Sequence, residues 1–105
     1  KNILGNISFA TVNIDQIVRI ICREMKVSER QIMSKSRTMD IALARQIAMY
    51  FCKELTETSL ANIGVHIGGR DHSTVIHACK NIEKKIQTDG DFKLRIQNIK
   101  NQISA

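Results

Sequence analysis

Apolar residues recur at helical intervals along most of this chain of 105 residues. The first clear stripe follows positions i, i+3, i+4, i+7 and i+11 and consists of Ile14, Ile17, Val18, Ile21 and Met25. This spacing predicts an amphipathic helix over about 13–26. Residues 1–12 precede the stripe, and we interpret them as a connector to one helical domain over 13–105.

Polar residues indicate where the next helix begins and ends. Ser28 can accept a hydrogen bond from a free amide, and Gln31 occupies the capping-box position three residues later, so a short helix is expected to end near Met33. The stretch 30–39 has three basic and no acidic residues and contains a polar loop over 34–38. We therefore expect an exposed basic loop here.

A longer helix is predicted from Asp40 to about Thr56, and we expect it to be the central scaffold. Its apolar repeat consists of Ile41, Ala44, Ile47, Ala48, Phe51 and Leu55. Ser59 can cap a further short helix over about 60–67, which Gly68 and Gly69 end because glycine tolerates a positive φ.

Asp71 can cap the next helix, which is expected to run to about Gln87. Its buried stripe would consist of Val75, Ala78, Cys79, Ile82 and Ile86. Two helices joined through a glycine-containing turn outline a helix-turn-helix at about 59–87.

The final segment, 91–103, has a weaker helical pattern and is expected to pack back over the other helices. Its apolar residues are Phe92, Leu94, Ile96, Ile99 and Ile103. Since no stretch alternates as a half-buried strand would, the sequence predicts an all-α fold of about six helices.

Charge adds a candidate partner to this picture. Sixteen Lys and Arg against ten Asp and Glu give a net charge of +6, and the sequence pI is near 9.6. Such a balance favours a polyanion, with nucleic acid ahead of an anionic membrane surface. The absence of a long apolar run or a signal-peptide pattern leads us to expect a soluble cytoplasmic protein.

Metal binding and catalysis find little support in the residue pattern. Cys22, Cys52 and Cys79 are widely spaced among apolar residues, form no C-x-x-C pair and are interpreted as reduced core residues. No phosphate-loop motif is present. Asp71, His72 and Ser73 are consecutive, so on a helix they would diverge and could not form a catalytic relay. We expect no enzyme activity and no metal site.

The start of the second motif helix carries side chains suited to duplex DNA. In a helix-turn-helix this turn enters the major groove, where Asp71 could accept from a cytosine amino group and His72 could donate or accept. Ser73 and Thr74 could reach bases or phosphates. A purely structural interpretation stays open at this point. Many helical bundles have a glycine that ends one helix and a capping residue that begins the next.

The run from Gly68 to Ala78, GGRDHSTVIHA, resembles the signature of DnaA initiators. Similarity extends upstream through the SKSR of 34–37, the segment 42–46 and the KELT of 53–56, so it covers roughly 14–86. The resemblance implies a Trp-repressor-like helix-turn-helix domain that binds the DnaA box at the replication origin. The same boxes would also allow it to regulate transcription.

Residue roles follow from this resemblance. It implies base contacts by Arg37 in the minor groove, by Asp71, His72 and Ser73 in the major groove, and by Leu60 and Ala61 at the start of the first motif helix. It implies phosphate contacts by Arg45, Gln46, Lys53 and Thr74. Ser73 and Ala61 stand where the family commonly has Thr and Pro, and Met39 and Leu43 replace positions that are basic in some relatives. A shallower salt dependence is therefore expected.

The resemblance also implies partners beyond this chain. ATP and Mg²⁺ would bind a separate AAA+ module in the family, and no cofactor is expected for the present residues. We expect a monomeric domain in a nucleoid-associated bacterial protein that oligomerises on the origin. Two alternatives stay open: an unrelated helix-turn-helix regulator, and a module that binds acidic phospholipids or a partner protein through 13–26, which carries Arg19, Arg23 and Lys26.

Overall fold

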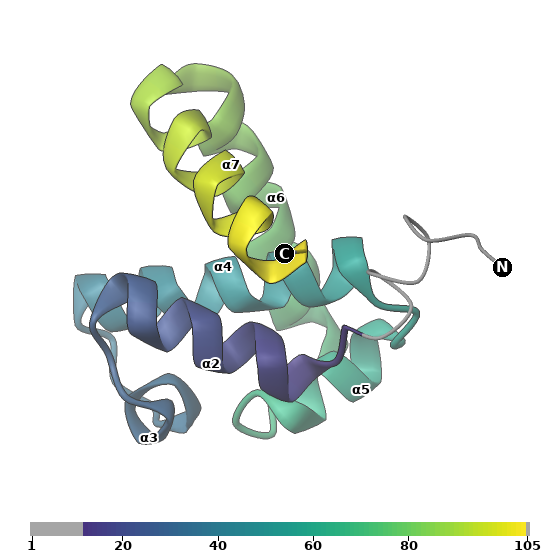
Figure 1. Ribbon diagram of the computed structural model, residues 1–105. Coiled ribbons are helices and arrows are strands. Elements are labelled where there is room, and N and C mark those ends of the chain that lie inside the picture. The colour runs from purple at the N-terminus through teal and green to yellow at the C-terminus, as the bar shows by residue number, and fades with distance from the viewer. Residues whose placement is uncertain (1–11, 105) are drawn as a thin grey trace, which may run out of the picture.

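The computed structural model describes residues 12–104, and all its regular structure is helical. Its elements are α2 (Ile14–Met25), α3 (Glu29–Met33), α4 (Met39–Leu55), α5 (Leu60–His66), α6 (His72–Thr88) and α7 (Gly90–Ser104). The predicted all-α fold is therefore confirmed, with six helices and no strand over 12–104 (Figure 1). The expected connector over 1–12 lies outside the described residues except for Val12.

Side-chain caps explain several of the helix starts. Ser28 and Gln31 form the predicted capping box: the Ser28 hydroxyl accepts from the Gln31 amide at 3.0 Å, and the Gln31 side chain accepts from the Ser28 amide at 2.9 Å. Asn13 and Gln16 form a second box that the sequence interpretation did not include. Each box satisfies two amide groups that would otherwise lack a partner.

Helix α4 starts differently, one residue before the predicted Asp40. Its N-cap, Thr38, makes no side-chain cap bond. The loop before it is ordered by its own hydroxyls instead: the Ser36 amide donates to the Ser34 hydroxyl at 3.2 Å, and the Ser36 hydroxyl bonds that of Thr38 at 3.1 Å. The basic loop thus has a defined shape next to the start of α4.

Helix α4 is the scaffold that the sequence predicted. It packs against α2, α3, α5 and α6, and Ala44, Ile47 and Ala48 on it are fully buried. The apolar face of α2 lies on this scaffold too, with Ile17 and Ile21 completely buried. Two of the cysteines, Cys52 and Cys79, are also core residues, whereas Cys22 is only half-buried.

Helices α6 and α7 form an antiparallel pair that extends away from the other helices (Figure 1). Four residues of the predicted stripe on α7 are buried: Phe92, Ile96, Ile99 and Ile103. The inclusion of Leu94 in that stripe was wrong, since its side chain is 65% exposed. Two residues along a helix correspond to a rotation of roughly 200°, which turns Leu94 away from the face of Phe92 and Ile96.

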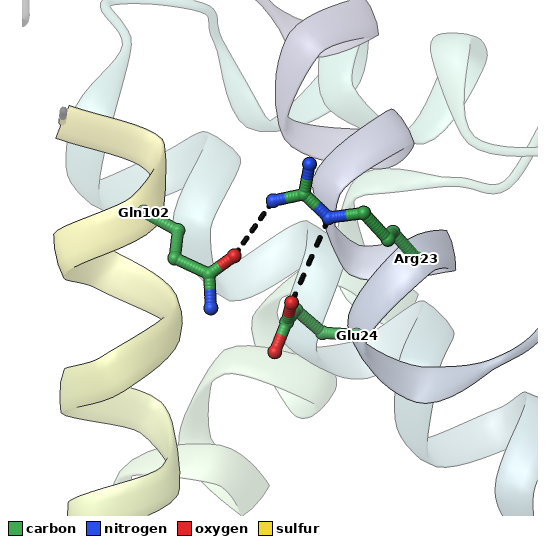
Figure 2. Close-up of polar contacts among 3 residues, drawn as sticks. All are labelled: Arg23, Glu24 and Gln102. Carbon is green, nitrogen blue, oxygen red and sulfur yellow. Dashed lines mark hydrogen bonds and ion pairs between the residues drawn. The ribbon is translucent and has the colours of Figure 1, made fainter.

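The end of α7 returns to α2, where one arginine bridges the two helices. Arg23 donates from Nη2 to the side-chain oxygen of Gln102 at 2.6 Å, and its Nε lies 3.7 Å from Glu24 (Figure 2). Because the Arg23 side chain is 65% exposed, this ion pair adds at most about 1 kcal/mol to stability. Burial of the apolar stripe of α7 is the main attachment.

Truncation at the centre of α4 tests the scaffold role. Ile47→Ala should lower the free energy of unfolding by about 2–5 kcal/mol, because Ile47 is fully buried and its truncation leaves a cavity in the core. Leu94→Ala removes apolar carbons from an exposed site and should change that free energy by less than about 0.5 kcal/mol. Urea denaturation followed by circular dichroism measures both, and equal effects would contradict the assignment of the core.

Candidate nucleic-acid interface

Helices α5 and α6 pack against each other and are joined by the tight turn 67–71, as the predicted helix-turn-helix requires. Ser59 caps α5 by accepting from the Asn62 amide at 3.1 Å. Gly68 and Gly69 have φ values of +83° and +69°, a region that side-chain-bearing residues rarely adopt. The two glycines therefore allow the chain to reverse between the helices.

Asp71 is the N-cap of α6, and its carboxylate is engaged with Thr74. Oδ1 accepts from the Thr74 amide at 2.9 Å and from the Thr74 hydroxyl at 3.0 Å. These two hydrogen bonds lower the pKa of the Asp71 carboxyl, with the amide bond as the larger cause. Asp71 is thus charged at neutral pH, and a base contact would use the carboxylate oxygen that does not cap the helix.

The first turn of α6 faces solvent while the rest of the helix is anchored below it. His72 and Ser73 are exposed. One turn later, Val75 and Cys79 are buried against the other helices. The predicted base-contacting residues Asp71, His72 and Ser73 therefore expose polar side chains at the start of a helix whose next turns are anchored in the core.

A hollow of about 580 Å³ between α4 and α6 brings other predicted residues together. Gln46 and Thr74 both line it, and the Gln46 side chain accepts from Asn81 at 2.6 Å. His77 and Asn81 also line the hollow, although the sequence interpretation assigned neither to the site. Their spacing could have indicated this, because they follow Thr74 by three and seven residues and so share its helix face.

The remaining predicted contact residues lie around this region with different exposure. Lys53 is exposed two turns after Gln46 on α4 and does not line the hollow. At the start of α5, Ala61 is exposed, whereas Leu60 is half-buried against the core and has less surface to offer a base. Arg37 is exposed in the basic loop.

Arg45, for which a phosphate contact is predicted, lines the same hollow as Gln46 and Thr74. Arg45 is only 8% exposed and points inward, where Nε donates to the carbonyl oxygen of Ile32 at 2.8 Å. Nη2 donates to the carbonyl oxygens of Ser34 at 2.8 Å and of Gln31 at 3.3 Å. These bonds engage Nε and Nη2, so Arg45 holds the basic loop, and its phosphate contact stays a prediction.

Arg70, which the sequence interpretation treated only as part of the motif, also reaches the basic loop. Its Nη2 donates to the carbonyl oxygen of Ser34 at 2.5 Å, and its Nη1 donates to that of Ile67 at 2.8 Å. Burial lowers the pKa of both guanidiniums, and the charge of Arg70 lowers that of Arg45 further. Both remain protonated, because arginine does not lose its proton in proteins.

Residues 12–104 contain no cluster of three or more His, Cys, Asp or Glu side chains that could hold a metal ion. Within the same range, every helix is too short or too polar to cross a membrane.

Comparison with known proteins matches this chain to a family. Residues 14–82 match the family described as bacterial dnaA protein helix-turn-helix. The chromosomal replication initiator protein DnaA of Chlorobaculum tepidum is 40% identical over 92 residues, which are 88% of this chain and 19% of that protein. The corresponding protein of Treponema denticola is 38% identical over 103 residues, which are 98% of this chain and 22% of that protein.

A third relative, the chromosomal replication initiator protein DnaA of Lachnoclostridium phytofermentans, is 41% identical over 93 residues, or 89% of this chain and 20% of that protein. The chain therefore spans about a fifth of the length of the relatives it matches. The family match runs from the start of α2 through the part of α6 that forms the helix-turn-helix. On these matches, the chain belongs to the bacterial DnaA helix-turn-helix family.

Proposed function

We propose that this chain binds double-stranded DNA and recognises DnaA-box elements at a replication origin, as the DNA-binding part of an initiator of chromosomal replication. The observation that carries the proposal is the exposed start of α6, where the N-cap Asp71 is followed by His72 and Ser73, in a helix-turn-helix of the DnaA family. Through the same elements the protein would also regulate transcription.

In the proposed complex, the start of α6 enters the major groove. His72 and Ser73 have free surface for base edges there, and Asp71 can accept from an exposed cytosine amino group. Gln46, Lys53 and Thr74 hold the phosphates. The Thr74 hydroxyl would turn from Asp71 toward a phosphate oxygen, which is a small change because a hydroxyl rotates freely.

Arg37 supplies the second contact, in the minor groove. A guanidinium on an exposed loop suits the narrow and electronegative minor groove of an A·T-rich site. The net charge of +6 supports binding to the DNA backbone in general. Reading two grooves would therefore combine a sequence-dependent contact from α6 with a shape-dependent contact from the loop.

The alternative that α2 binds acidic lipids or a partner protein receives less support. The apolar face such binding needs is turned into the core, with Ile17 and Ile21 completely buried. Only the polar face, with Arg19 and Arg23, is left on the surface.

Alanine substitutions of the residues proposed to enter the two grooves test the proposal. His72→Ala and Arg37→Ala should each weaken binding to a DnaA-box duplex by about 1–3 kcal/mol, with less effect on a scrambled duplex. His66→Ala and Arg19→Ala, at exposed positions outside the proposed contacts, are the matched controls. Fluorescence anisotropy titrations measure the affinities. Equal weakening on both duplexes would refute sequence-specific recognition by these residues.

Salt dependence separates phosphate contacts from base contacts. Lys53→Ala should reduce the slope of log Kd against log salt concentration by about 1 on box and scrambled duplexes alike, because one phosphate contact is lost. His72→Ala should lower the affinity for the box while leaving the slope nearly unchanged. Titrations at four salt concentrations between 50 and 300 mM provide the slopes. A slope unaffected by Lys53→Ala would remove Lys53 from the interface.

A further inference from the structure

Two arginines from different elements meet on one backbone oxygen. Arg45 on α4 and Arg70 in the α5–α6 turn both donate to the carbonyl oxygen of Ser34, at 2.8 and 2.5 Å. Each guanidinium also donates to a second carbonyl oxygen: Arg45 to that of Ile32 on α3, and Arg70 to that of Ile67 in its own turn. The end of α3, the basic loop and the turn before α6 are thereby tied together.

This arrangement carries an electrostatic cost. No carboxylate takes part in it, since the ion pair found within residues 12–104 is the distant one of Arg23 and Glu24. The two like charges are held near each other and partly removed from water, which opposes their protonated forms. Carbonyl dipoles are their hydrogen-bond partners. Apolar residues in their place would leave the carbonyl oxygens of Ile32, Ser34 and Ile67 without these donors, so the pair secures the position of the loop.

The glycines of the motif make room for this contact. A side-chain carbon on Gly68 would overlap Nη1 of Arg70 and lie 2.7 Å from the carbonyl oxygen of Met33. A side-chain carbon on Gly64 would overlap the carbonyl oxygen of Arg70, whose amide donates to Gly64 at 2.8 Å. Gly68 therefore does more than allow a positive φ. Because it has no side chain, the guanidinium of Arg70 can pass beside it to reach Ser34.

The contact joins the two segments that carry the proposed DNA-reading groups. Ser34 is three residues before Arg37, and Arg70 is two residues before His72. Figure 1 shows α3 and the α5–α6 turn on the same side of α4, and the bond from Arg70 to Ser34 links this turn to the loop after α3. A loop held in its bound position loses less conformational freedom when it meets DNA.

We propose that Arg45 and Arg70 form a clamp on the Ser34 carbonyl, and that this clamp fixes the position of Arg37 relative to the first turn of α6. Arg45 and Arg70 are positioning residues here, acting through Arg37. The inference rests on the proposed function, because it assumes that Arg37 reads the minor groove.

The experiment uses a base substitution that alters the minor groove and leaves the hydrogen-bonding groups of the major groove unchanged. Replacing each adenine of a DnaA-box duplex by 2,6-diaminopurine leaves the major-groove pattern of adenine intact and adds an amino group in the minor groove. The ratio of the two Kd values reports the minor-groove contact. The variants are Arg70→Lys and Arg45→Lys, which keep the charge but lose the planar fork of donors, with Arg19→Lys as the matched control.

The wild-type chain and Arg19→Lys should bind the adenine duplex about tenfold more tightly than the diaminopurine duplex. Arg37→Ala should bring this ratio of Kd values close to one. The two clamp variants should reduce it to about twofold or less, and they should still bind the box more tightly than a scrambled duplex. Adding Arg70→Lys to Arg37→Ala should cause little further loss, because both act on one contact.

Each other result has a distinct meaning. Unchanged discrimination in both clamp variants would overturn the clamp and leave the proposed function standing. No discrimination by the wild-type chain would overturn the minor-groove role of Arg37, and the clamp with it. Circular dichroism checks folding, and if Arg70→Lys does not fold, Arg45→Lys carries the test. NMR order parameters for residues 35–38 without DNA should fall in the clamp variants, and unchanged values would also contradict the clamp.

Discussion

The packing of α6 on α4 is the interaction on which the rest of this structure depends. Ala78 and Cys79 on α6 are small and almost fully buried, which lets α6 approach α4 closely. Burial raises the thiol pKa of Cys79 to about 11 and that of Cys52 to about 12, so both act as inert packing groups at neutral pH. The direction of α6, and hence the place of its first turn, follows from this contact.

Most of the fold could be predicted from the sequence because its determinants are local. Apolar spacing and the caps at Ser28, Ser59 and Asp71 specify helices through groups only three or four residues apart. Helix ends were less certain: α4 starts at Met39 without a side-chain cap, so the polar residue Asp40 was a misleading boundary.

The role of Arg45 could not be predicted in the same way. Ile41, Arg45 and Ala48 are spaced by four and three residues, so periodicity alone puts Arg45 on the buried face of α4. Buried arginines are rare, which favours a surface interpretation when the partners are unknown. Its acceptors lie 11 to 14 residues away along the chain and are backbone oxygens, which no side-chain pattern reveals. The contact of Arg70 spans 36 residues and is hidden for the same reason.

The acceptor at the centre of this arrangement is a main-chain atom, and that has a consequence for how the loop can change. The exposed Lys35 side chain takes no part in the bonds from Arg45 and Arg70, so it can change without removing the anchor, whereas the hydroxyls of Ser34, Ser36 and Thr38 also order the loop. Met39, 82% exposed beyond the loop, shows an apolar residue accommodated there. A surface built in this way separates evolvability from stability, because its exposed side chains can change during evolution while the backbone that carries them keeps its position.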